Sequence, residues 1–364
     1  MSRPLKWLFL LMMSSALMFG FMHQVMPVEE LNFERLHIFL FNLCTGGTLL
    51  LYFSEGQAGL SIRGRFFLFF SVCFALSAFF DYSPAAMLLP WPLAVLVEQV
   101  RVRTFGRVLP YALFLGKESV SRKFHQAALL CLSLALVFSS FVVFNKEFGP
   151  WVTLDGFTLN TFYLAFSFPV SLISMAVIFA LMRREPVGLI HYLKEIAFWG
   201  VNLGVIVFFL FILGHLYLPQ MAIATTLFFL VLLVFLLYRH LGIRSQQKSF
   251  LTSGILFLLI TAVSGTLYIF MKYSGNWSPE QLQPLLRLHA FTALYGWNLS
   301  GLTVICRQGD FPIQLHSTKV IVLHWITVLI LCPLGYFFLP FAVVAVVAYL
   351  VLLGKLLFSE SVPV

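Results

Sequence analysis

Long apolar stretches follow one another along most of the chain, and shorter polar segments separate them. Each stretch runs for about 17–25 residues, which is the length of a helix that crosses ~30 Å of hydrocarbon. Polar and apolar residues do not alternate within the stretches, as they would in membrane-spanning strands. Because backbone N–H and C=O groups inside lipid must pair within their own segment, we expect each stretch to be a transmembrane helix.

The pattern predicts an all-α fold, a polytopic membrane bundle that forms a single transmembrane domain over residues 1–364. The fourth span is short and contains Pro90 and Pro92, which predicts a broken or re-entrant segment. Pro169 and Pro333 are expected to kink their helices. The first span is expected to be retained, because no cleavage site of small residues follows it. The spans, about 12 in all, are predicted at 5–24, 36–53, 66–80, 84–98, 126–144, 158–182, 192–214, 219–238, 250–271, 288–306, 319–338 and 340–357.

Composition and charge agree with a membrane protein. Of 364 residues, 60% are hydrophobic and 10% are charged, whereas a soluble domain has about 25% charged residues. With the N-terminus inside, the outer segments hold only four of the 23 basic residues, namely Arg35, Lys146, Lys272 and Arg287. This positive-inside bias predicts that both termini are cytoplasmic. It also accounts for the net charge of +9 without a nucleic-acid partner.

The longest cytoplasmic loop is predicted at 99–125. It contains an amphipathic stretch, 108–115, between basic flanks, which we expect to lie along the lipid headgroups. Docking of a partner subunit is the alternative for this loop. No segment outside the spans is long enough to form a soluble domain with its own active site. The five cysteines form no CxxC pair, so the sequence predicts neither a zinc ribbon nor a disulfide framework.

One short motif occurs twice. Residues 35–39 read RLHIF and residues 287–291 read RLHAF, each beside the expected outer end of a span. The histidines at this membrane depth come from four different spans and are His23, His37, His215 and His289. Imidazole is a common ligand of haem iron and copper, so we predict that His37 and His289 bind one shared group, with His23 or His215 as a third ligand.

The residues that follow each histidine support this prediction. On an α-helix, positions seven and eleven residues further on return to nearly the same face. Small residues on that face allow a helix or a flat macrocycle to approach closely. Asn298, deep in the second span, needs a hydrogen-bond partner. The small or weakly polar residues of the two seams are Cys44, Thr48, Gly296 and Ser300.

Arg35 and Arg287 admit two interpretations. By default they reach to the headgroups, and in a haem protein they would pair with propionates. The histidines could likewise be interfacial residues, and the repeat could be an old duplication that shares no ligand. A second, inner site would use His324, with His191 facing it.

The segments ERLHIFLFNLCTGGTLL and LHAFTALYGWNLSGLTVICRQ resemble the histidine helices of NnrS-type proteins. Those are twelve-helix bacterial membrane proteins that contain haem and copper and are linked to nitric-oxide stress; their helices are similar to those of the haem–copper oxidase subunit I group. The resemblance implies ligand roles for His37 and His289 in a bacterial inner membrane. The family's first motif often reads HxH, where this chain has RLH. The chain also lacks the adjacent histidine pair of an oxidase copper site, so no binuclear oxygen-reducing centre is expected.

Two classes of function follow. The first is a haem- or metal-binding protein for electron transfer or response to a small gas such as NO, alone or as a subunit of a respiratory assembly with redox partners. The second is a transporter of an uncharged or small substrate, or a non-catalytic membrane anchor. Ion-coupled transport usually needs ionisable groups at the bilayer midplane, and Glu195, near the inner interface, is expected to be isolated there. No phosphate loop, GxSxG or HExxH motif indicates a soluble type of enzyme.

Overall fold

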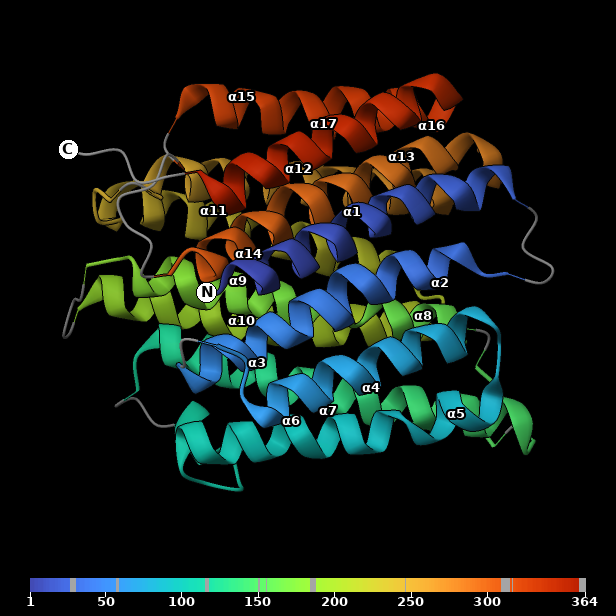
Figure 1. Cartoon of the computed structure of the whole chain (residues 1–364), viewed down its shortest axis with the longest axis horizontal. Helices are drawn as coiled ribbons and strands as arrows, with labels where there is room; N and C mark the ends of the chain where they lie inside the picture. Colours follow the sequence, from blue (N-terminus) through green and yellow to red (C-terminus); the bar gives the residue numbers. More distant parts are fainter. Residues whose placement is uncertain are drawn as a thin grey trace.

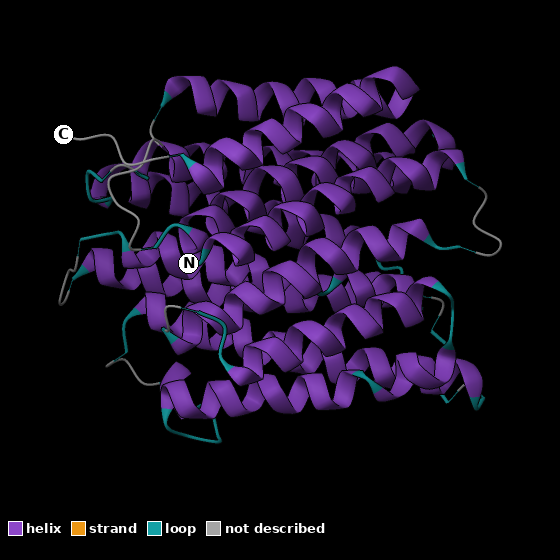
Figure 2. Ribbon diagram, viewed as in Figure 1, coloured by secondary structure: helices purple, strands orange, loops and turns teal. Residues whose placement is uncertain are grey.

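The computed structural model describes residues 1–26, 31–56, 59–114, 118–149, 151–154, 156–183, 188–245, 247–308, 315 and 317–359. Over these residues the chain forms long helices joined by short loops, and no strand is present (Figure 2). The helices run side by side in one bundle (Figure 1). The all-α prediction is confirmed.

Ten helices in the described part of the chain are long and apolar enough to cross a membrane, which confirms a polytopic membrane protein. Several of them join two or three successive segments, with π-helical turns written η. They are α1 (Arg3–Val25), α2–η1–α3 (Phe33–Glu55), α4 (Ile62–Phe79), α5–α6 (Ser83–Phe105), α7 (Val120–Glu147), α10 (Leu189–Leu213), α11 (Tyr217–Leu241), α12 (Lys248–Ser274), α15–η5–α16 (Thr318–Phe337) and α17 (Leu339–Phe358).

Two further predicted spans form helices that are broken or more polar. One consists of α8 (Leu159–Leu164) and α9 (Ser167–Ala180). The break between them at Ala165–Phe166 lies where the ring of Pro169 would clash with the carbonyl four residues earlier, so the predicted kink is confirmed. The other is a continuous run of α13 (Pro279–Phe291), η3 (Thr292–Asn298) and α14 (Leu299–Cys306).

Local capping sets several of the helix ends. The Ser61 and Ser119 side chains accept hydrogen bonds from the first turns of α4 and α7. Ser278 forms a capping box at the start of α13, which therefore begins nine residues before the predicted position 288. Gly106 and Gly275 end α6 and α12 in the left-handed conformation that glycine adopts without strain.

The fourth span is broken, as one of its two predictions had it, and the loop after it is shorter than expected. Residues 83–105 form two helical segments with a turn at Leu89 between them, and together they are long enough to cross a membrane, unlike a short re-entrant segment. Because α6 continues to Phe105 and α7 begins at Val120, the loop expected at 99–125 contracts to 106–119. Its apolar side chains are exposed at Val108 and Phe114, as expected for contact with headgroups, while Leu115 lies outside the described residues.

The first RLHxF helix lies at the centre of the bundle. Of the residues in its most apolar stretch of 18, 89% are buried, whereas the corresponding shares are 28% in α10 and 33% in α11 at the periphery. It packs beside α1, and α9 contacts both η1 and η3 (Figure 1). The rings of Trp7 in α1 and Phe358 in α17 are 4.6 Å apart, so the described ends of the chain lie at the same end of the bundle.

Candidate functional site

His37 is buried against α1. Its Nδ1 lies 2.8 Å from the carbonyl oxygen of Ala16. The ring fills a notch at Gly20, where an added Cβ would come within 2.9 Å of Nδ1. Gly20 stands one turn after Ala16 on the same helix face, and its missing side chain lets the imidazole reach the Ala16 carbonyl.

His289 repeats this arrangement on α12. Its Nδ1 lies 2.9 Å from the carbonyl oxygen of Thr261. Its ring fills a notch at Gly265, four residues further on, where a Cβ would come within 2.9 Å of Cε1. Each motif histidine therefore packs against the same pattern on the preceding helix, which is a small residue followed four positions later by glycine. This small-xxx-Gly pattern was not predicted as the partner of the histidines, although it is visible at 16–20 and 261–265.

The backbone contact determines which nitrogen of each ring carries the hydrogen. A carbonyl oxygen can only accept a hydrogen bond, so Nδ1 of His37 and of His289 must carry the hydrogen. In the neutral ring the lone pair then lies on Nε2, which has no hydrogen-bond partner among the described residues in either histidine. Histidines that bind metals usually donate their other N–H in this way.

A tyrosine of the second motif helix meets the first histidine. The Tyr295 hydroxyl oxygen lies 2.9 Å from His37 Nδ1 and shares its hydrogen with the Ala16 carbonyl. The backbone carbonyl of Tyr295 accepts a hydrogen bond of 2.6 Å from His324 Nε2. Its ring packs edge-on against Tyr349, with centroids 5.1 Å apart. Tyr295 therefore links three of the spans.

Each of three buried or half-buried histidines precedes a π-helical segment by two or three residues. η1 (Phe39–Gly47) follows His37, η3 follows His289, and η5 (Thr327–Leu331) follows His324. π-turns are rare and frequently occur at functional sites. They also hold more residues per turn than an α-helix, so the seven-and-eleven spacing used for the predicted seams does not keep one face.

Gly296 of the second predicted seam, and three glycines near the seams, pack against other helices. Gly296 faces Phe257 of α12, and Gly47 faces Phe67 of α4. Further along, Gly46 and Gly301 both face α9, against Val170 and Ser174, one turn apart. Trp297 Nε1 also donates a hydrogen bond of 2.7 Å to Ser171 Oγ, which adds to the contact between the second motif helix and α9. Beyond the histidines, α9 therefore lies against both motif helices, at glycines close to the seams that were predicted to face a macrocycle.

The two motif arginines have carboxylate partners within the chain. Arg35 Nη1 lies 2.7 Å from an oxygen of Asp81. Arg287 Nη1 lies 3.6 Å from Glu34, and the other oxygen of Glu34 lies 3.7 Å from His23 Nε2. The second motif is thus joined to the residue before the first one, at the same end of the bundle as His37.

Asp81 lies between α4 and α5, and Lys146 is its second cationic partner, at 3.2 Å. Burial acts to raise the pKa of Asp81, but the hydrogen bonds and charges of Arg35 and Lys146 outweigh it and lower the pKa below its usual value.

Other predicted ligands lie elsewhere. His215 is exposed in the turn between α10 and α11 and contacts the ring of Tyr217, close to it in sequence. His324 is fully buried, and its Nδ1 has no partner in the described part of the chain. His191 contacts the ring of its own neighbour, Tyr192.

Two predictions about polar residues have definite outcomes. The Oδ1 atom of Asn298 is buried and has no hydrogen-bond partner among the described residues, so the expected partner is not a protein group there. Glu195 is not isolated as predicted, because the Lys123 ammonium donates to both of its oxygens at 2.9 and 2.8 Å. The five cysteines are free, as the sequence predicted.

The site is therefore a pair of imidazoles held in one ligand-like pose on different helices. No group of three or more His, Cys, Asp or Glu side chains that could hold a metal occurs within the described ranges. The arrangement provides neutral nitrogen donors in a largely apolar setting, without a preformed cage of carboxylates or thiols. Comparison with known proteins adds no relative, since no family model, curated protein or solved structure matches the chain.

Proposed function

We propose that the chain crosses a bacterial inner membrane twelve times, with both termini cytoplasmic. The ten long apolar helices supply ten crossings, and α8–α9 and α13–η3–α14 supply the other two. The contact between Trp7 and Phe358 supports an even number of crossings, because it holds the two described ends together. The basic residues then gather on the side that the positive-inside rule requires.

Within this membrane domain, we propose that His37 and His289 bind a redox-active metal, as haem iron or as copper. The observation that carries the proposal is the repeated pose, with Nδ1–H on a backbone carbonyl in a glycine notch and Nε2 without a partner. A hydrogen bond from Nδ1–H to a backbone carbonyl orients the ring and raises the basicity of Nε2 as a ligand. A metal held there would supply one-electron transfer or an open position for a small gas such as NO.

The two histidines serve separate positions in this proposal. Each ring is fixed to a different helix, α1 or α12, and the seams beyond them are filled by protein. Arg35 and Arg287 already have carboxylate partners, so neither is reserved for a propionate. The residues fit an imidazole ligand at each place better than two axial ligands of one shared iron.

Optical spectra test the proposal. The protein, purified in detergent from cells supplied with haem and copper, is expected to contain metal and to change its visible spectrum on reduction with dithionite. His37→Ala and His289→Ala should each lower the metal content, whereas His215→Ala, at an exposed turn, should not. A colourless, metal-free protein contradicts the proposal.

Transport of an uncharged solute is the second candidate, and unpaired oxygens favour it. The side-chain oxygens of Asn42 and Thr48 in the first motif helix, and of Asn298 and Thr303 in the second, are buried without partners among the described residues. Buried polar atoms normally find a protein or water partner. If these helices line a wet path, the metal-free protein in vesicles should raise the permeability to small uncharged solutes, and Asn298→Leu should reduce it.

A further inference from the structure

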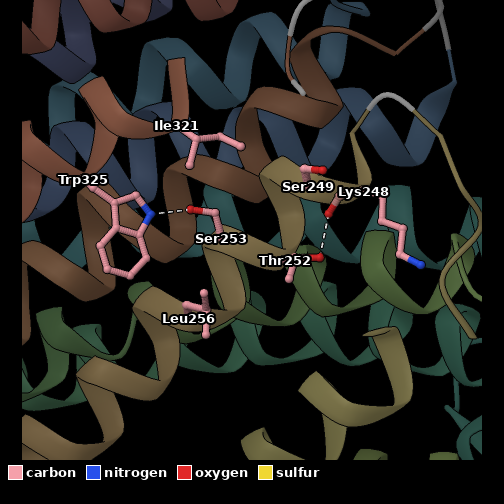
Figure 3. Close-up of a pocket in the computed structure, with 7 residues that line it drawn as sticks. All are labelled: Lys248, Ser249, Thr252, Ser253, Leu256, Ile321 and Trp325. Carbon is pink, nitrogen blue, oxygen red and sulfur yellow. Dashed lines mark hydrogen bonds between the residues drawn. The ribbon is translucent and has the colours of Figure 1, made fainter. Parts of the chain in front are cut away.

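A pocket of about 450 Å³ lies between the first turns of α12 and the helix α15 (Thr318–Ile326). It is open to the surroundings, and its walls differ in character from end to end (Figure 3). The polar part is formed by Lys248, Ser249, Thr252 and Ser253. The apolar part is formed by Leu256, Ile321 and Trp325.

The residues of α12 that line the pocket become less polar with distance from the start of the helix. Lys248 and Ser249 start the helix, Thr252 and Ser253 follow one turn later, and Leu256 follows after another turn. Two turns of helix span about 11 Å. In Figure 3 Lys248 lies beside the loop that enters the helix, and Leu256 lies at the opposite end with Trp325. The pocket therefore has a polar end beside the loop, its mouth, and an apolar end at Leu256 and Trp325, which suits an amphipathic ligand.

The indole of Trp325 is a fixed wall. Its Nε1 donates a hydrogen bond of 2.6 Å to Ser253 Oγ. Its ring stacks on Phe257 with centroids 4.7 Å apart. Because both interactions fix the same side chain, the apolar part of the pocket is preformed and does not depend on a ligand. Tryptophan in this setting is typical of the membrane–water interface.

Basic residues gather in the segments beside the mouth of the pocket. The segments 239–256 and 317–325, which form this end of α11, α12 and α15, contain no Asp or Glu. Lys248 Nζ donates to the carbonyls of Arg239 and Gly242, which holds its charge at the loop end. Within the described residues, Arg239, Arg244, Lys248 and Lys319 have no ion-pair partner. The pocket mouth is thus complementary to an anion.

We propose that this pocket binds one anionic phospholipid of the cytoplasmic leaflet. Its phosphate headgroup lies at Lys248 and Ser249, and an acyl chain enters along Leu256 and Trp325 towards the open side. The volume suits the headgroup, glycerol and first methylenes, with the remaining chains in the bilayer. The site is independent of the histidine pair and rests only on the proposed orientation for the choice of leaflet.

Quenching of Trp325 by brominated lipid tests the site. Protein in phosphatidylcholine vesicles is titrated with brominated phosphatidylglycerol or brominated phosphatidylcholine. The Trp325 signal is the difference between the parent and Trp325→Phe, because the chain has seven tryptophans. We expect half-quenching at a several-fold lower mole fraction of the anionic lipid. Lys248→Gln should move that midpoint towards the phosphatidylcholine value.

Matched variants complete the test. Lys272→Gln, at the other end of α12, should leave the midpoint unchanged. Because Lys248 also binds α11, the pair Arg244→Gln and Lys319→Gln provides a second route to the same charge loss. Equal midpoints for the two lipids, or an anionic preference that survives both sets of substitutions, would overturn the proposal. Reversal by soluble glycerol phosphate would also overturn it, since it would indicate a free-anion site.

Discussion

His37 and Tyr295 are 258 positions apart in the sequence, yet the Tyr295 hydroxyl lies 2.9 Å from His37 Nδ1 inside the bundle. The same nitrogen bonds the Ala16 carbonyl, so one N–H serves α1 and η3 together. The first motif histidine is therefore positioned by the second motif helix as well as by its own neighbour. His289 has the backbone contact alone.

Tyr295→Phe tests this asymmetry. The substitution removes the hydroxyl and keeps the ring packed against Tyr349, so the fold should lose about 1 kcal/mol, the net value of a buried hydrogen bond. Thermal unfolding in detergent measures the loss. If His37 holds a metal, its optical band should also shift in this variant, while the band that depends on His289 should not. An unchanged spectrum and melting curve would show that the Tyr295 hydroxyl does not position His37.

The glycine notches give a second prediction. Gly20→Ala and Gly265→Ala would each place a methyl group within 2.9 Å of an imidazole, which displaces the ring from its carbonyl. Overpacking of this kind typically costs about 1–3 kcal/mol, more than the roughly 0.5–1 kcal/mol that alanine gains over glycine in a helix. Lower thermal stability and lower metal content are expected.

Gly354→Ala is the matched control for the notches, because a Cβ at this helical position in α17 meets nothing within 4 Å. It should be neutral or stabilising. If Gly20→Ala and Gly265→Ala behave like Gly354→Ala in both stability and metal content, the notches do not position the histidines.

The buried pair Lys123–Glu195 gives a third prediction. Lys123 retains 3% of its side-chain exposure, so Glu195→Gln leaves a buried ammonium without its carboxylate. Breaking such a pair typically costs about 3–5 kcal/mol. The double variant Lys123→Met, Glu195→Leu should recover much of that stability because no charge is left unpaired. Unfolding curves of the three proteins check this, and a double variant no more stable than Glu195→Gln would contradict it.

Acid should weaken the outer contact between Arg35 and Asp81. The folded-state pKa of Asp81 is lowered, so its contribution to stability is present above the pKa of the unfolded state and is lost as the pH falls through the folded value. Melting temperatures measured between about pH 3 and 7, the range around an ordinary carboxyl pKa near 3.9, should fall less steeply for Asp81→Asn than for the parent. Parallel curves would exclude a role for this carboxylate.

Features that depend on local chemistry were predictable from the sequence. Hydrophobic length located the ten long helices, and Pro169 located a kink, because its ring acts on a carbonyl only four residues away. His37 and His289 could be singled out as candidate site residues because the RLHxF motif occurs twice in the sequence. The start of α13 was missed because the segment 279–287, which is more polar, extends the helix ahead of the apolar stretch, although Ser278 and Gln281 carry a capping signal.

Tertiary relationships were not predictable in the same way. Nothing in the local pattern indicates that Ala16 and Thr261 would supply carbonyls, or that α9 would lie against Gly46 and Gly301. The spacing of seven and eleven residues did not identify one helix face, because it assumes an unbroken α-helix and π-helical segments follow both histidines. The carboxylate partner of Arg287 was hidden because Glu34 is more than 250 residues away in the chain.

Metal stoichiometry in the histidine variants is the most direct test of the central claim, that His37 and His289 are metal ligands at two separate positions. Metal and haem are counted per chain in the parent, His37→Ala, His289→Ala and the double variant, each purified as a folded protein. We predict that each single variant loses about half of the bound metal and that the double variant loses all of it. A parent without metal, or single variants that retain the full amount, would contradict the account, and complete loss in either single variant would show that the two histidines share one group.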